Sequence, residues 1–211
     1  MKQKITCPCG SAFFAEVPEE INLDRESEYI DKITDGSFMN YYCPGCGKKH
    51  KPEFPITLLW PGRHIRFEVL PELDRGEFYR RKKDPPVPKD SSLTPETIVS
   101  YPELSDRIAV IRDGLEPIVV EALKYYLLLK AEETYSNLEI SAWYQGKGPE
   151  SIEFHLHGIR ADEVAVSRVP LGLYEKTLEN YKKHPRSEIF SSLRRRSYIS
   201  VQNMMRPGEL K

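Results

Sequence analysis

The sequence has few cysteines and no long apolar run, and both absences narrow what the protein can be. The most apolar stretch, from Ile118 to Leu129, is interrupted by Glu121 and Lys124, so no transmembrane helix is predicted. The residues before Cys7 contain no apolar segment of secretory-signal length. Four cysteines in a chain without an export signal fit a reducing compartment, where thiolates bind metal more often than they form disulfides. We therefore expect a soluble cytoplasmic protein and no membrane partner.

Net charge is also almost absent, because 31 basic residues balance 32 acidic ones to leave −1. This neutrality argues against binding to nucleic acid or anionic lipid through a net positive charge of the whole protein. Local basic features remain, namely the runs 80–83 and 194–196 and a group near Trp60 that comprises Arg63, His64 and Arg66. A nucleic-acid-binding zinc ribbon therefore stays open as an alternative function, although no dense basic face is evident.

Motifs of catalysis are missing as well. No segment reads as a phosphate-cradling loop, a nucleophile elbow or a dinucleotide fingerprint, and no serine–histidine or cysteine–histidine pair has a local signature. We predict no catalytic and no cofactor-binding residues, and we expect a protein that is not an enzyme.

What the sequence does contain is a pair of cysteine motifs with a shared pattern. Cys7-Pro-Cys9-Gly is matched by Cys43-Pro-Gly-Cys46-Gly. Proline after the first cysteine fixes a turn, and glycine after the second allows a positive φ and a close backbone approach to sulfur. Zinc favours four such soft ligands in a tetrahedron. The predicted site is therefore one structural Zn²⁺ bound by Cys7, Cys9, Cys43 and Cys46, which would also stabilise a module too small for a large core.

The first motif is one residue short, Cys-x-Cys in place of Cys-x-x-Cys, and this strains the usual metal-binding turn. Two alternatives follow: a ligand set that includes His50, or a fold without metal. His50 lies four residues after Cys46 in the charged run from Lys48 to Lys51. We interpret it as a solvated residue of that run.

Around these motifs the chain resembles the CpXC protein family. The resemblance covers roughly residues 4–130 and is carried by Ile5-Thr-Cys-Pro-Cys-Gly, Glu20-Ile-Asn, Asp35-Gly, Tyr42-Cys-Pro-Gly-Cys-Gly and Val69-Leu-Pro-Glu72, with softer matches from Ile98 to Ile108 and from Arg112 to Lys124. The family is bacterial and archaeal. The resemblance implies a metal site without implying an activity, and the shortened first motif departs from the family pattern.

The predicted fold class is α+β, with an N-terminal β-rich, zinc-ribbon-like module that contains an inserted short helix. Strands are expected at 4–6, 11–17, 55–60 and 64–70, with a turn at Pro61-Gly62 and a helix capped by Asp24 that ends before Gly36. An α/β region of helices on a small antiparallel sheet follows. The predicted domains are a module at 1–80, a linker rich in proline and charge at 81–94, the α/β region at 95–185 and a basic tail with a helix at 186–211.

Within the C-terminal half the pattern predicts helices over 100–113, 117–133 and 171–183 and strands over 138–145, 151–159 and 164–169. His155 and His157 lie two apart on the second of these strands, so both project from the face that also carries Glu153. Two imidazoles at that spacing can share a metal. Because no third ligand is evident, we interpret them as solvated histidines.

These features favour a zinc-binding, non-catalytic interaction or scaffold protein with a protein partner. A redox-responsive zinc switch is the main alternative. Cys-x-Cys, a gap of 33 residues and Cys-x-x-Cys are similar to the zinc centre of the redox-regulated holdase chaperone, although only the cysteine spacing is shared.

Overall fold

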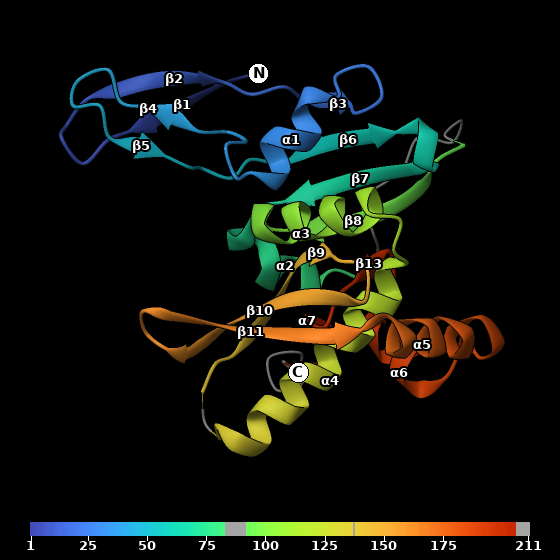
Figure 1. Ribbon diagram of the computed structural model, residues 1–211. Helices are drawn as coiled ribbons and strands as arrows, with labels where there is room; N and C mark the ends of the chain where they lie inside the picture. The colour runs from blue at the N-terminus through green and yellow to red at the C-terminus, as the bar shows by residue number, and fades with distance from the viewer. Residues whose placement is uncertain (83–91, 137, 206–211) are drawn as a thin grey trace. The chain divides into compact units, whose positions relative to one another are not determined.

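The computed structural model describes residues 1–82, 92–136 and 138–205, and it confirms the α+β class (Figure 1). The chain divides into two compact units, Met1–Ser105 and Asp106–Lys211. Most of the linker predicted over 81–94 lies outside the described residues, so its character stays a prediction. The last linker position, Thr94, begins a strand.

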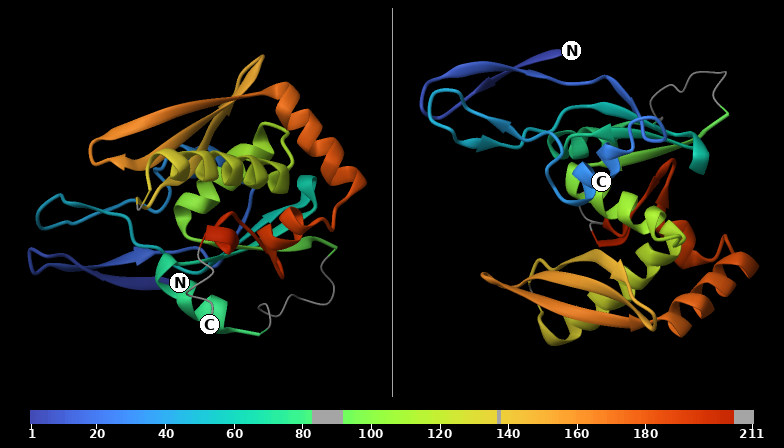
Figure 2. Two further views of the ribbon diagram at one scale, coloured as in Figure 1. Left: turned by 90° about the horizontal axis from the view of Figure 1, so that it is seen from below. Right: turned by 45° about the horizontal axis from the view of Figure 1, so that its top comes forward.

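Two β-hairpins form the N-terminal part of the first unit and lie side by side (Figures 1 and 2). They share a small apolar cluster built on buried Ile5, Ala15 and Val17. So little buried apolar surface cannot stabilise two short hairpins by itself. The first hairpin consists of β1 (Lys2–Thr6) and β2 (Ala12–Glu16), and the second of β4 (Tyr41–Tyr42) and β5 (Lys49–His50).

A short helix, α1 (Glu28–Thr34), lies in the segment between the hairpins, and its start differs from the prediction. Its N-cap is Ser27, whereas Asp24 accepts a hydrogen bond of 2.6 Å from the backbone of Gly62. The carboxylate that was predicted to cap the helix thus stabilises a distant turn. Gly36 follows the helix with φ of +75°, as the predicted helix end requires.

A mixed sheet completes the first unit, with its strands in the order β8-β7-β6-β3. The alternation predicted for the 64–70 strand is confirmed, because Phe67 and Val69 are buried. The prediction missed β8, whose sequence opens with Thr-Pro-Glu and reads as the end of a linker. The strands that the first unit contributes to this sheet are β3 (Glu20–Asn22), β6 (Ile56–Trp60), β7 (Ile65–Leu70) and β8 (Thr94–Val99). The short 3-10 helix η1 (Pro61–Arg63) connects β6 to β7.

Beyond the sheet strands, η2 (Glu72–Asp74), α2 (Arg75–Arg80) and α3 (Tyr101–Arg112) follow β7 and β8. The buried guanidinium of Arg75 binds both carboxylate oxygens of Glu72, at 2.6 and 2.7 Å, and also Glu103 at 2.7 Å. Helix α3 forms one half of the predicted capping box, since Ser100 Oγ accepts the backbone N–H of Glu103 at 3.4 Å. The reciprocal bond is replaced, because the Ser100 N–H donates to Leu70 O and Glu103 Oε1 binds Arg75.

The second unit packs helices on an antiparallel sheet of order β11-β10-β9. As predicted, Ile152, Phe154 and Leu156 form the buried face of β10. The elements after α3 are α4 (Pro117–Thr134), β9 (Ser141–Lys147), β10 (Ser151–Arg160), β11 (Glu163–Pro170), α5 (Leu171–Lys183), α6 (Glu188–Leu193), β12 (Arg194–Arg195), β13 (Tyr198–Ile199) and α7 (Gln202–Met205).

A buried ionic cluster stabilises this unit. The Lys124 ammonium on α4 lies 2.6 Å from Asp106 Oδ2 and 2.8 Å from Glu121 Oε1. The remaining carboxylate oxygens accept backbone N–H groups from Tyr144 and Val201. Burial by itself would lower the pKa of Lys124, but the two carboxylates outweigh it and raise that pKa. The cluster joins helix, sheet and C-terminal segment within one unit.

No helix among the described residues is long and apolar enough to span a bilayer.

Candidate metal centre

The two cysteine motifs occupy the loops of the two hairpins, and both loops use the same hydrogen bonds. In the first loop the Cys7 N–H donates to Ser11 O at 2.8 Å and the Gly10 N–H donates to Cys7 O at 2.9 Å. These bonds fold the loop around the Cys7 side chain. Gly10 has φ of +90°, a conformation that glycine adopts without steric cost.

The second loop repeats this arrangement with one more residue. The Cys43 N–H donates to Lys48 O at 2.9 Å, and the N–H of Gly47, with φ of +72°, donates to Cys43 O at 2.8 Å. The Cys-x-Cys motif therefore makes a shorter version of the same turn. The missing residue shortens the loop without changing its hydrogen-bond pattern.

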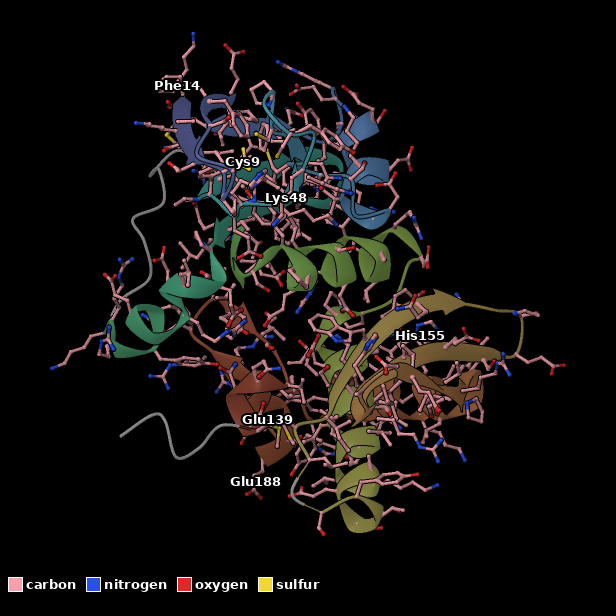
Figure 3. The ribbon with its side chains drawn as sticks, turned by 90° about the vertical axis from the view of Figure 1, so that its left-hand side faces the viewer. Cys9, Phe14, Lys48, Glu139, His155 and Glu188 are labelled. Carbon is pink, nitrogen blue, oxygen red and sulfur yellow. The ribbon has the colours of Figure 1, made fainter. Side chains whose placement is uncertain are left out.

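The loops bring all four sulfur atoms together, within 4.8 Å of one another. Across the loops, Cys7 Sγ lies 3.6 Å from Cys46 Sγ, and Cys9 Sγ lies 3.6 Å from Cys43 Sγ. A regular tetrahedron with zinc–sulfur bonds of about 2.3 Å has edges of about 3.8 Å. The group is thus of the right size to hold one metal ion. Cys7 and Cys43 are buried, whereas Cys9, labelled in Figure 3, and Cys46 are exposed.

Ser11 and Gly45 complete the centre, although the sequence motifs did not predict either of them as a site residue. Hydrogen bonds from the side chain and then the backbone of Ser11 lower the pKa of the Cys9 thiol to about 6. A lowered pKa favours the thiolate, which is the form that binds metal. Gly45 lies so close to Ser11 that a Cβ built on it would be 2.2 Å from Ser11 Oγ. The signal in the sequence is that Gly45 lies within the second cysteine motif and Ser11 directly follows the first.

His50 is not the solvated residue that we predicted. It is half-buried on β5, its ring lies 5.9 Å from the ring of Phe13, and its Nε2 is buried without a hydrogen-bond partner. Strand pairing with Tyr41 places it beside the apolar cluster of the hairpins. The ligand group comprises the four cysteines and does not include His50.

The histidines of β10 lie on one face as predicted, with ring centroids 6.5 Å apart. His155, labelled in Figure 3, is 3.5 Å from Glu153, which also pairs with Arg168 at 3.0 Å. Among the residues described, only the four cysteines form a group of three or more metal-ligating side chains. The strand histidines therefore lack the third ligand that a metal site needs.

Two members of the basic group near Trp60, Arg63 and Arg66, make contacts within the first unit. Trp60 is 6% exposed, and the Arg63 guanidinium lies 5.7 Å from the centre of its ring. Arg66 pairs with Glu68 at 2.7 Å and with Glu20 at 3.4 Å. The indole ring is thus not free to stack on a base, and the cation of Arg66 is neutralised. Of the two basic runs, 80–83 extends beyond the described residues, and two of the three arginines at 194–196 are half-buried.

These features define a class of protein: an α+β protein with a four-cysteine group, built from two hairpin loops, that can hold a metal ion. The sequence profile of the CpXC protein family matches residues 5–124. The chain belongs to the CpXC family.

A relative from Treponema pallidum (strain Nichols), described as an uncharacterized protein, is 27% identical over 217 residues. The similarity spans 95% of this chain and 97% of that protein, so it extends through both units. No solved structure matches the chain.

Proposed function

We propose that Cys7, Cys9, Cys43 and Cys46 bind one Zn²⁺ ion whose role is to hold the two hairpins together. The observation that carries this proposal is the group of four sulfur atoms within 4.8 Å of one another. Four thiolates in a tetrahedron select zinc or iron among the common metals, and a closed four-cysteine shell is typical of structural zinc. The hairpin cores are small, so metal binding would supply much of their folding free energy.

The same shell argues for a non-catalytic role. A catalytic zinc keeps an exchangeable water and usually has three protein ligands that include histidine or carboxylate. Four thiolates occupy every tetrahedral position and make the metal a poor Lewis acid. The zinc would therefore form a zinc-ribbon-like module without a reaction centre of its own.

We further propose that this module is the interaction part of a scaffold protein, with a protein as its partner. Each hairpin exposes an aromatic side chain: Phe14 is 68% exposed and Tyr42 is 63% exposed. Figure 3 labels Phe14 at the outside of its hairpin. Large aromatic side chains contribute strongly to protein interfaces. Zinc would act by fixing the hairpins that present them.

Metal content and cobalt substitution test the zinc proposal. Elemental analysis of dialysed protein should give about one zinc per chain. Cobalt should produce the intense visible bands of a tetrahedral thiolate site, and neither azide nor a pH step from about 6 to 9 should shift them, because no bound water is present. A protein that is fully folded without metal would contradict the proposal. Bands that respond to azide would indicate an open coordination position and a hydrolytic site.

A redox-responsive switch is the second candidate, and the exposure of Cys9 and Cys46 favours it. Hydrogen peroxide would oxidise two thiolates to a disulfide, with two protons consumed and two waters formed, and the metal would lose ligands. Treatment with peroxide and then dithiothreitol should release zinc and restore its binding if this function holds. If the protein keeps its zinc in peroxide, the redox switch is contradicted and the structural role of zinc is the one that remains.

A further inference from the structure

Tyr101, the first residue of α3, contacts both ends of the hairpin that carries Cys43 and Cys46. On the side that leads into β4, its ring lies 5.1 Å from the ring of buried Phe38. On the side that leaves β5, its hydroxyl accepts the Phe54 N–H and donates to the Phe54 carbonyl, both at 3.1 Å. One side chain thus fastens the two chain segments at the base of the hairpin.

Glu53 strengthens this attachment from the hairpin side. Its Oε1 accepts the backbone N–H of Tyr101 at 2.8 Å, and its Oε2 accepts the backbone N–H of Glu72 at 2.6 Å. These N–H groups belong to the first residues of α3 and η2, where amides have no partner within the helix. The carboxylate therefore joins the hairpin to the starts of two helical segments.

The hairpin needs such an attachment because β4 and β5 have only two residues each. A metal ion fixes the tip of the hairpin, where the cysteines lie, but does not fix its base. The direction in which Cys43 and Cys46 face Cys7 and Cys9 therefore depends on how the base is held. Holding ligands in place before binding reduces the conformational entropy lost on binding.

We propose that Tyr101 and Glu53 are positioning residues of the metal centre, and that they couple metal occupancy to the start of α3. This inference rests on the proposed zinc site. Coupling is reciprocal by thermodynamic necessity: whatever these contacts contribute to metal affinity, the metal contributes to the contacts. Zinc binding should therefore stabilise the hydrogen bonds of Tyr101 and Glu72 with Glu53.

The first test measures zinc transfer from folded protein to a chromophoric chelator. Tyr101→Phe removes the two hydroxyl hydrogen bonds and keeps the ring, and Glu53→Gln removes the charge with little change of shape. Each variant should lose zinc about threefold to tenfold faster than the wild type, as the loss of one or two hydrogen bonds predicts.

Two matched controls separate positioning from general destabilisation. Thr57→Val removes two hydrogen bonds in the same unit, one donated to Glu68 at 3.2 Å and one accepted from Arg66 at 3.4 Å. Tyr135→Phe alters an exposed tyrosine. Both controls should release zinc at the wild-type rate. Equal rates in the controls and in the Tyr101 and Glu53 variants would overturn the inference.

The second test measures hydrogen exchange at the backbone amides of Tyr101 and Glu72. If Tyr101 and Glu53 had a purely structural role, the exchange rates of these amides would not depend on the metal. Removal of zinc from the wild type should accelerate their exchange about tenfold, and Glu53→Gln should abolish the difference. Exchange that is independent of zinc in a wild type that binds one zinc overturns this inference alone. A wild type that binds no metal overturns the proposed zinc site as well.

Discussion

Gly45 packs against Ser11, and this contact joins the second cysteine loop to the first. A Cβ on Gly45 would lie 2.2 Å from Ser11 Oγ and 3.2 Å from Ser11 Cβ. The hydroxyl cannot simply rotate away, because it also makes the hydrogen bond that lowers the pKa of Cys9. Glycine at position 45 therefore allows the two cysteine loops to approach each other closely.

Replacing Gly45 with alanine should weaken zinc binding. Overpacking at a close contact typically costs about 1–3 kcal/mol, so the affinity should fall about tenfold or more in a chelator competition. Gly146→Ala is the matched control, since a Cβ at that position meets nothing within 4 Å. Unchanged affinity in Gly45→Ala would show that the loops do not need this contact.

Removal of zinc should unfold the hairpins and spare the second unit. The hairpins share an apolar cluster of three buried residues with four partly buried ones packed against it, and we expect this small core to need the metal to stay folded. Hydrogen exchange after chelation, or in Cys43→Ser, should show lost protection over residues 1–17 and 38–54 and retained protection in α4 and β10. Equal protection of the hairpins with and without metal would contradict a structural role for zinc.

Lys124→Ala should destabilise the second unit by about 3–5 kcal/mol, because buried Asp106 loses the ammonium that lies 2.6 Å from it. Buried Glu121 loses the same ammonium and keeps the guanidinium of Arg107, which lies farther away at 3.7 Å. Urea denaturation followed by circular dichroism measures the loss. Lys130→Ala on the exposed side of α4 should stay within about 0.5 kcal/mol of the wild type. Similar effects of the two substitutions would mean that the ionic cluster contributes little.

Stability should decline in strong alkali, in part through Tyr101. Burial raises the pKa of this phenol to about 12, so the folded protein keeps a proton that the unfolded chain releases near pH 10. The stabilising contribution is complete below about pH 10 and is lost as the pH rises to about 12. Burial also raises the pKa of Tyr144 and Tyr174. Denaturation curves at several pH values should show the decline, and Tyr101→Phe should make it shallower. If the free energy of unfolding falls equally steeply with pH in Tyr101→Phe and in the wild type, Tyr101 does not contribute to the alkaline decline.

The sequence by itself determined the family, the α+β class and most of the elements. Turn chemistry is local, so Gly10, Gly36 and Gly47 could be recognised as residues that adopt a positive φ. Hydrophobic periodicity is also local, and it located α4 and the buried face of β10 correctly. The paired motifs pointed to the four cysteines that the structure brings together, because their residue types and spacing are typical of loops that bind a metal.

Tertiary structure decided which partners these local elements meet. Asp24 bonds to Gly62 and not to the helix that follows it, and β8 becomes a strand because β7 lies beside it. His50 is half-buried because its strand packs on the apolar cluster of the hairpins. The contacts of Tyr101 with Phe38 and Phe54 join residues 63 and 47 positions apart. Such pairings depend on chain packing across long sequence separations, which local propensity does not encode.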